Sequence, residues 1–319
     1  MRRLALLCSM LLLLGAAPTA TAADAPGSCA SAVSKSVGAW HSETIGSATD
    51  VDWFRFSLTS TRRVLVTLGR LPKNYSLALY SSCGTLLATS NRAATTYEEI
   101  DRSLAAGTYR VRVAGVGGAT SSSPYSLRFR PLASGVVVLS SAAWKDGAGR
   151  LHIPGEVYNN TSSTRSGVRV TVNLIHADGG IQKTVTVATE VELLRPHARS
   201  PFHFIISAPP DYARLRYRVS SAATSAVPVK LTLTNRTAYR ADDGSWHFPG
   251  SVRNPNSYTV RLIEVMLTLY NDRGGVFNTM TEPTTPATLI SGATATFDLV
   301  PTERFIGANR YTTLAQGRR

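Results

Sequence analysis

The amino-acid sequence predicts an all-β protein built as three β-sandwich domains in series. Between residues 50 and 130, apolar and polar residues alternate over short runs, the pattern of strands with one buried face. Residues 136–204 then align with residues 231–299 at a constant offset of 95, which indicates two copies of one domain. No segment carries a sustained helical period, so short strands at this spacing favour sandwiches over a parallel α/β sheet.

The first residues are typical of a secretory signal. Arg2 and Arg3 form a basic start, an apolar stretch runs from Leu4 to Leu14, and Ala20-Thr21-Ala22 fits a cleavage site. The apolar stretch is shorter than the roughly 20 residues that a membrane-spanning helix needs. We therefore expect a signal peptide at residues 1–22, no transmembrane segment, and a secreted protein, extracellular or periplasmic.

Outside that signal, the only cysteines are Cys29 and Cys83. In an oxidising compartment two cysteines most simply form one disulfide, with two free thiols as the alternative. The bridge would close a long loop and contribute about 4 kcal/mol in the chain-entropy model. A zinc site would need more ligands than two cysteines supply.

The first domain is expected at residues 28–132. Its candidate strands alternate apolar and polar residues, and turn residues such as Leu71-Pro72-Lys73-Asn74 separate them. The predicted strands are Asp52–Leu58, Arg63–Leu68, Ser76–Tyr80, Thr85–Ser90, Gly107–Val113 and Pro124–Arg130.

The order of these pieces resembles the bacterial pre-peptidase C-terminal domain, a jelly-roll-like module found beside secreted proteases. The resemblance implies a jelly-roll-like sandwich with a binding role. It is carried by Asp50–Phe56, Val66–Leu68, Leu77–Tyr80, Gly84–Ala88, Ala106–Val113 and Pro124–Leu127.

The repeat predicts two immunoglobulin-like sandwiches, at residues 133–225 and 228–319. In each copy a long strand, Arg165–Ile175 or Thr259–Tyr270, leads into a hairpin turn. The anchors of the alignment are specific pairs. They include Trp144 with Tyr239, His152 with His247, Gly155 with Gly250, Asn159 with Asn254, and Phe202 with Phe297.

The second copy resembles the small bacterial FxLYD-type sandwich. Leu267-Thr268-Leu269-Tyr270-Asn271-Asp272 matches the motif that names this family, apart from the leading Phe. The first copy departs from it, with Ile175 and His176 in place of Tyr270 and Asn271.

Catalytic signatures are absent from the sequence: there is no G-x-S-x-G, no H-E-x-x-H and no phosphate-binding glycine loop. We predict no enzyme and no cofactor. His152 and His247 recur at one place in each copy, so we expect packing or hydrogen bonding at a strand end. Histidines on separate domains would make a metal site only if the domains fold onto each other.

Asp50 and Asp52 precede the Trp53 strand, and some members of the resembled family bind calcium. Calcium takes six or more oxygen ligands, and Glu43 is the one other carboxylate nearby. The favoured interpretation is turn residues before a strand, so no metal ligand is assigned.

The protein is strongly basic, with a formal net charge of +14 and 29 arginines among 34 basic residues. Arginines at alternate positions within a strand lie on one sheet face. If neighbouring sets line up, they form a cationic stripe that pairs with carboxylates or sulfates, with isolated solvated arginines as the alternative. The candidate polyanion-binding residues are Arg110, Arg112, Arg128, Arg130, Arg214, Arg216 and Arg218.

The leading functional prediction is a secreted, non-enzymatic binding or adhesion protein that engages an acidic polysaccharide or an extracellular protein through its sheets. Duplicated modules more often bind a ligand or act as spacers than catalyse a reaction. Nucleic acid is not expected, because no aromatic-interleaved single-strand motif is present. The alternatives are a structural spacer or assembly factor in an envelope complex and, more remotely, an unrecognised hydrolase or protease-accessory protein.

Overall fold

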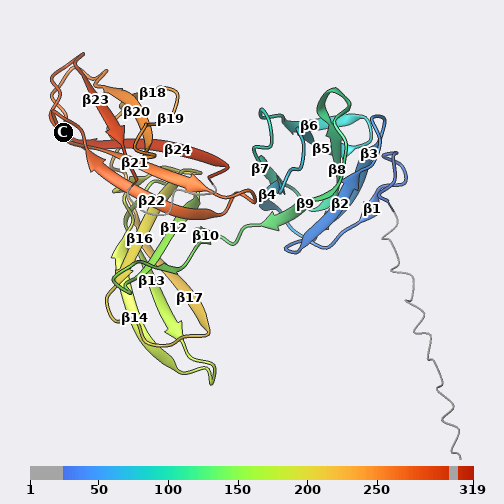
Figure 1. The fold of residues 1–319 in the computed structure, drawn as a ribbon, viewed down its shortest axis with the longest axis horizontal. Coiled ribbons are helices and arrows are strands. Elements are labelled where there is room, and N and C mark those ends of the chain that lie inside the picture. The colour runs from blue at the N-terminus through green and yellow to red at the C-terminus, as the bar shows by residue number, and fades with distance from the viewer. Residues whose placement is uncertain (1–23, 302–307) are drawn as a thin grey trace, which may run out of the picture.

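The computed structural model describes residues 24–301 and 308–319, and these residues form six β-sheets with one short 3-10 turn (Figure 1). The predicted all-β fold class is therefore confirmed. The signal peptide predicted at residues 1–22 lies outside the described residues. None of the described residues belongs to a helix long and apolar enough to cross a membrane.

The first sandwich packs two sheets around an apolar core that includes Phe54, Phe56 and Phe129. One sheet has the order β1-β3-β8-β5-β6 and the other β2-β9-β4-β7. The strands are β1 (Val33–Ser34), β2 (Trp40–Ile45), β3 (Val51–Leu58), β4 (Arg62–Gly69), β5 (Tyr75–Ser82), β6 (Thr85–Ser90), β7 (Glu98–Leu104), β8 (Gly107–Gly115) and β9 (Ser121–Pro131).

Alternation explains these strands, since Phe54 and Phe56 of β3 are buried while Arg55 and Ser57 are exposed. The predicted disulfide is present. Cys29 bridges to Cys83 over a separation of 54 residues and ties the segment before β1 to the β5–β6 turn.

The second sandwich has β10, β11 and β16 paired with β12 in one sheet, and β14, β15 and β17 paired with β13 in the other. Its strands are β10 (Gly135–Ser141), β11 (Trp144–Lys145), β12 (Leu151–Asn160), β13 (Arg165–Ile175), β14 (Ile181–Ala188), β15 (Leu193–Leu194), β16 (Arg199–Ile206) and β17 (Arg214–Ala223).

The third sandwich repeats this topology. β18, β19 and β23 pair with β20, and β22 and β24 pair with β21. The strands are β18 (Thr232–Asn235), β19 (Tyr239–Arg240), β20 (Trp246–Arg253), β21 (Arg261–Tyr270), β22 (Val276–Pro283), β23 (Thr294–Leu299) and β24 (Arg310–Arg318).

Two of the residue pairs that align between the copies, the glycines and the phenylalanines, match because they pack against each other in both copies. A Cβ atom on Gly155 would lie 2.2 Å from the Phe202 ring, and one on Gly250 would lie 2.3 Å from the Phe297 ring. Only glycine allows an aromatic ring to pack this closely against the neighbouring strand. The glycine and the phenylalanine are therefore one packing unit, which appears twice.

The asparagines at the matching position of the two copies close a loop in each. The Asn159 amide donates to the backbone carbonyls of Leu194 (2.9 Å) and Arg195 (3.0 Å). The Asn254 amide makes the equivalent bonds, and both asparagines are fully buried. Buried backbone carbonyls without such donors would destabilise the fold, which explains an asparagine at this place in both copies.

The second and third sandwiches stack through non-equivalent faces. β12 is buried along nearly its whole length, because β22 of the third sandwich packs against its outer side and Tyr158 packs against Leu65 and Leu132 of the first sandwich. On β21 the outward residues Met266, Thr268 and Tyr270 are each about 1% exposed. The outer face of the β21 sheet is thus covered, whereas the equivalent outer face of the β13 sheet remains open (Figure 1).

Candidate functional site

The predicted arginines of the first sandwich do not share a face. Arg110 and Arg112 lie on β8, and Arg128 and Arg130 lie on β9 of the opposite sheet. Arg130 Nη2 donates to the carbonyl oxygen of Val138 at 3.0 Å, so this side chain holds the start of the second sandwich. The two sets therefore do not combine into one stripe.

Arg128 has a local structural role as well. Its Nε donates to the Gly38 carbonyl at 2.8 Å, and its guanidinium stacks over the Trp40 ring at 5.6 Å. Burial lowers the pKa of Arg128, and burial with the nearby Arg128 and Arg199 charges lowers that of Arg130. Side chains held in this way are less available to a partner.

The third predicted set forms an open cationic surface on the second sandwich. Arg214, Arg216 and Arg218 are all exposed on β17, alternating with half-buried Leu215 and Tyr217. Arg169 of the neighbouring strand β13 is exposed on the same face. We call this surface, defined by Arg169, Arg214, Arg216 and Arg218, the cationic face.

Polar side chains continue the cationic face across the sheet. Arg218 lies opposite Thr171 on β13, which shares a hydrogen bond of 2.8 Å with Thr186 on β14. Arg216 lies opposite Asn173, whose Oδ1 accepts a hydrogen bond from Thr184 at 2.9 Å.

The cationic face carries uncompensated charge. Within residues 24–301 and 308–319, none of its four arginines has a carboxylate at ion-pair distance. The sequence pattern of β17 identified three of these arginines. Arg169 was missed because it stands alone among apolar and hydroxyl residues.

All three sandwiches meet at Arg199. Its Nη2 lies 2.6 Å from Glu99 Oε1 of the first sandwich, and its Nη1 lies 3.2 Å from Glu156 Oε2. Tyr270 of the third sandwich donates to the other Glu156 oxygen at 2.6 Å. Burial would lower the pKa of Arg199, but Glu156 and Glu99 outweigh burial and raise it, so the arginine stays charged.

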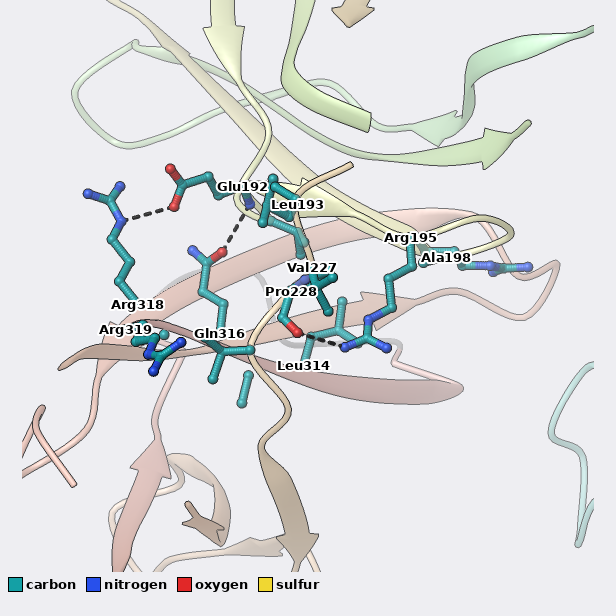
Figure 2. A pocket seen from close by; sticks show the side chains of 16 residues that line it. Glu192, Leu193, Arg195, Ala198, Val227, Pro228, Leu314, Gln316, Arg318 and Arg319 are labelled. Atoms are coloured by element: carbon teal, nitrogen blue, oxygen red, sulfur yellow. Dashed lines mark hydrogen bonds and ion pairs between the residues drawn. The ribbon is translucent and has the colours of Figure 1, made fainter. Parts of the chain in front are cut away.

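A cleft of about 490 Å³ opens between the second and third sandwiches, beside the linker that joins them (Figure 2). Arg195 donates to the Pro228 carbonyl at 3.0 Å, and Arg318 pairs with Glu192 at 2.9 Å. Basic side chains thus stand at the rim. Apolar lining comes from Leu193, Val227 and Leu314, of which Val227 is 82% exposed.

Three carboxylates gather at one end of the first sandwich. Asp24, Asp50 and Asp52 each offer an oxygen atom within 4.8 Å of the others. Asp52 is fully buried, and its Oδ1 accepts no hydrogen bond from the described residues, while Tyr125 donates to its Oδ2. Burial, and then the charges of Asp50 and Asp24, raise the pKa of Asp52 to about 7 against the opposing Tyr125 hydrogen bond.

This donor set fits a hard divalent cation such as Ca²⁺, which prefers carboxylate oxygens. Asp24, Asp50 and Asp52 would hold the ion, and its charge would offset the repulsion between them. The sequence singled out Asp50 and Asp52 as turn residues. Asp24 was missed because it is distant in sequence and reaches the site through the tertiary fold.

The repeated histidines lie in matching environments. The His152 ring stacks on Trp144 with centroids 4.2 Å apart, and the His247 ring stacks on Tyr239 at 4.9 Å. Each histidine also contacts a diagonal neighbour on the next strand, His203 at 3.1 Å in the first copy and Asp298 at 2.7 Å in the second. Both histidines thus pack and hydrogen-bond at a strand end, as the sequence predicts.

No protein-family model matches the chain, and no curated protein matches it. Among solved structures, it is similar to the pre-peptidase C-terminal domain of a collagenase from Bacillus anthracis. The identity is 13%, the match covers 31% of this chain and 93% of that domain, and the TM-score is 0.28.

The chain is also similar to two glycosidases. One is a glycosyl hydrolase family 2 member from Bacteroides cellulosilyticus, at 9% identity over 66% of this chain, with a TM-score of 0.33. The other is the exo-chitosanase CsxA of Amycolatopsis orientalis, at 13% identity over 61% of this chain, also with a TM-score of 0.33. The chain spans about 27% of each enzyme.

Proposed function

We propose that this protein is a non-enzymatic binding module, exported by its signal peptide, that engages an acidic extracellular polymer through the cationic face. The observation that carries the proposal is the asymmetry between the two copies. The face bearing Arg214, Arg216 and Arg218 is open in the first copy, and the equivalent face is buried in the second.

The chemistry of the cationic face suits a polyanion. Arginines two positions apart on a strand are spaced by about 7 Å, so an extended polymer can contact several of them at once. Each guanidinium presents a planar set of donors that pairs with a carboxylate or a sulfate through two hydrogen bonds. The threonine hydroxyls beside them offer further partners for sugar hydroxyls.

A spacer or assembly role is the second candidate, and the junction at Arg199 favours it. The network of Glu99, Arg199, Glu156 and Tyr270 links all three sandwiches, and a rigid spacer needs such fixed junctions. The two candidates respond differently to salt. Binding of a polyanion by exposed arginines weakens as salt rises, and a packed protein interface does so much less.

The test is binding of polygalacturonate and dextran sulfate to the mature protein at low and physiological salt, with neutral dextran alongside. We expect the Arg214→Ser/Arg216→Ser/Arg218→Ser variant to lose at least about tenfold in affinity, given roughly 1 kcal/mol or more per charge-assisted contact.

The matched control removes the same charge from other exposed positions: Arg62→Ser/Arg236→Ser/Arg261→Ser. We expect this control to retain most of the affinity. Equal losses of affinity in the two triple variants would show that binding depends on net charge and not on the cationic face. Failure of the unmodified protein to bind either polyanion would favour the spacer role.

A further inference from the structure

We propose that His152 and His203 bind a borderline divalent transition metal, of which Zn²⁺ is the type, at the boundary between the second and third sandwiches. Nδ1 of His152 and Nε2 of His203 lie 3.1 Å apart. Zinc binds imidazole nitrogen at about 2.0–2.1 Å, so two ligands of a tetrahedral site are separated by about 3.4 Å. The observed spacing is within a few tenths of an ångström of that value.

Asp146 orients the first of these ligands. Its Oδ2 lies 3.1 Å from His152 Nε2 and 2.6 Å from Arg150 Nε, and its Oδ1 accepts two backbone N–H bonds. An ionised carboxylate only accepts hydrogen bonds, so His152 donates through Nε2. In the neutral ring the lone pair is then on Nδ1, the atom that faces His203.

A carboxylate behind a histidine is the usual support of a metal-binding imidazole, because it fixes the tautomer and raises the basicity of the ligand. The Trp144 ring, stacked on His152 with an interplanar angle of 10°, fixes the plane of the imidazole as well. His152 is therefore held in one orientation before any metal binds. Such preorganisation reduces the entropic cost of binding.

The pair opens onto a space that can hold further ligands. A cavity of about 280 Å³ adjoins His152 and His203, and β22 of the third sandwich supplies its other wall. Asn278, Met280 and Glu282 line that wall. A metal on the two histidines would complete its coordination with water or with the Glu282 carboxylate, and the latter would link the two sandwiches.

The second copy lacks this ligand pair. At the position of His203 it has Asp298, and His247 Nδ1 lies 2.7 Å from the Asp298 carboxylate. A histidine paired with a partly exposed carboxylate satisfies both groups without a metal. Histidine at this position gives the first copy a second nitrogen ligand, which suits a metal that prefers nitrogen. The second copy, which has aspartate there, serves as an internal comparison.

The test uses the untagged mature chain, freed of metals with EDTA and then titrated with Zn²⁺ by calorimetry. Millimolar Ca²⁺ is kept present so that Asp24, Asp50 and Asp52 do not compete. We expect one equivalent of Zn²⁺ to bind. His203→Asn removes a ligand and should weaken Zn²⁺ binding at least about tenfold. Asp146→Asn leaves both ligands in place but removes the support of His152, and should weaken Zn²⁺ binding about 10- to 100-fold.

His176→Asn, at an exposed turn, is the matched control and should leave binding unchanged. Zinc-edge X-ray absorption on the unmodified protein gives a readout that does not depend on any variant folding. We expect nitrogen ligands at about 2.0–2.1 Å. The proposal is overturned by an absence of Zn²⁺ binding, by equal binding in His203→Asn and His176→Asn, or by a spectrum with oxygen ligands alone.

Discussion

The guanidinium of Arg199 lies 2.6 Å from the carboxylate of Glu99, although the two residues belong to different sandwiches. The same guanidinium contacts Glu156, which in turn accepts a hydrogen bond from Tyr270 of the third sandwich. One cation therefore pairs with two carboxylates, and through Glu156 this network connects all three sandwiches. This junction sets which sheet faces remain open to a partner.

Removing the cation should destabilise the protein strongly. Glu156 is 2% exposed, so Arg199→Ala leaves a buried carboxylate without its counter-ion. Breaking a buried pair from one side costs about 3–5 kcal/mol, and the partial exposure of Arg199 places the expected loss near the lower end, about 3 kcal/mol. Denaturant unfolding of the mature chain measures this loss.

The control for Arg199 is an exposed interdomain pair. Arg318 and Glu192 lie 2.9 Å apart with more than half of each side chain in solvent. Such pairs contribute about 0–1 kcal/mol, so Glu192→Gln should lower the free energy of unfolding by no more than about 1 kcal/mol. A loss in Arg199→Ala no larger than in Glu192→Gln would mean that the junction does not hold the domains together.

Tyr270 should matter through its hydroxyl group. The O–H donates to Glu156 at 2.6 Å, and the ring packs against Tyr97 of the first sandwich with centroids 6.1 Å apart. Tyr270→Phe keeps the ring but leaves the buried carboxylate with one partner fewer, at an expected cost of about 1.5–3 kcal/mol.

Tyr270→Ile installs the residue of the first copy, and we expect a larger loss because the ring contact disappears as well. Tyr239→Phe, at a residue 48% exposed, should change stability by less than about 0.5 kcal/mol. Thermal unfolding of the three variants ranks them. An unchanged Tyr270→Phe variant would show that the hydrogen bond contributes little.

The strands and the repeat could be predicted from the sequence because they depend on local patterns. The period-two alternation of β3, and the matched pair Gly155 and Gly250, each follow from contacts within one sandwich. The disulfide was predicted by counting cysteines. By contrast, β7 was missed, since its charged residues Glu98 and Glu99 break the apolar alternation.

What the sequence did not predict comes from contacts between sandwiches. On β12 the alternation would place His152, Glu156 and Tyr158 in solvent, yet all three are buried. The third sandwich packs against this side of β12, and Tyr158 packs against Leu65 and Leu132 of the first sandwich. The arginines of β8 and β9 follow one another along the chain but enter opposite sheets. Period-two patterns define a face within a strand and do not say which strands are neighbours.

Glu190 should make stability depend on pH. Burial raises its pKa above the ordinary value of 4.5, with a further increase from the nearby Glu264, against a hydrogen bond from Thr281. The folded protein then keeps this proton at a pH where the unfolded chain has lost it. Because the folded state binds more protons, stability falls as pH rises from about 4.5.

The Glu190→Gln variant removes this pH dependence. Urea unfolding gives the free energy of unfolding of both proteins at pH 4 and pH 7. We expect the variant to gain stability relative to the unmodified protein as the pH rises from 4 to 7. Glu192→Gln, at an exposed neighbour, should show a smaller difference between the two pH values. The same difference in both variants would assign the effect to net charge rather than to burial of Glu190.

Calcium should stabilise the first sandwich through Asp24, Asp50 and Asp52. A ligand that binds only the folded state adds about 2.7 kcal/mol when its free concentration is about 100 times Kd. We therefore expect millimolar Ca²⁺ to raise the unfolding temperature of EDTA-treated protein. Asp50→Asn should reduce the increase, because one of three clustered carboxylates is lost.

Asp52→Asn gives the sharpest form of this test. Without calcium, neutralising a fully buried carboxyl group that has one unpartnered oxygen removes a desolvation cost, so the variant should be at least as stable as the unmodified protein at pH 8. Adding Ca²⁺ should raise the unfolding temperature of this variant only slightly. Asp178→Asn, an exposed turn residue, should respond to Ca²⁺ like the unmodified chain. If Ca²⁺ shifts all these proteins equally, or none of them, the three aspartates are structural residues of a strand end and hold no ion.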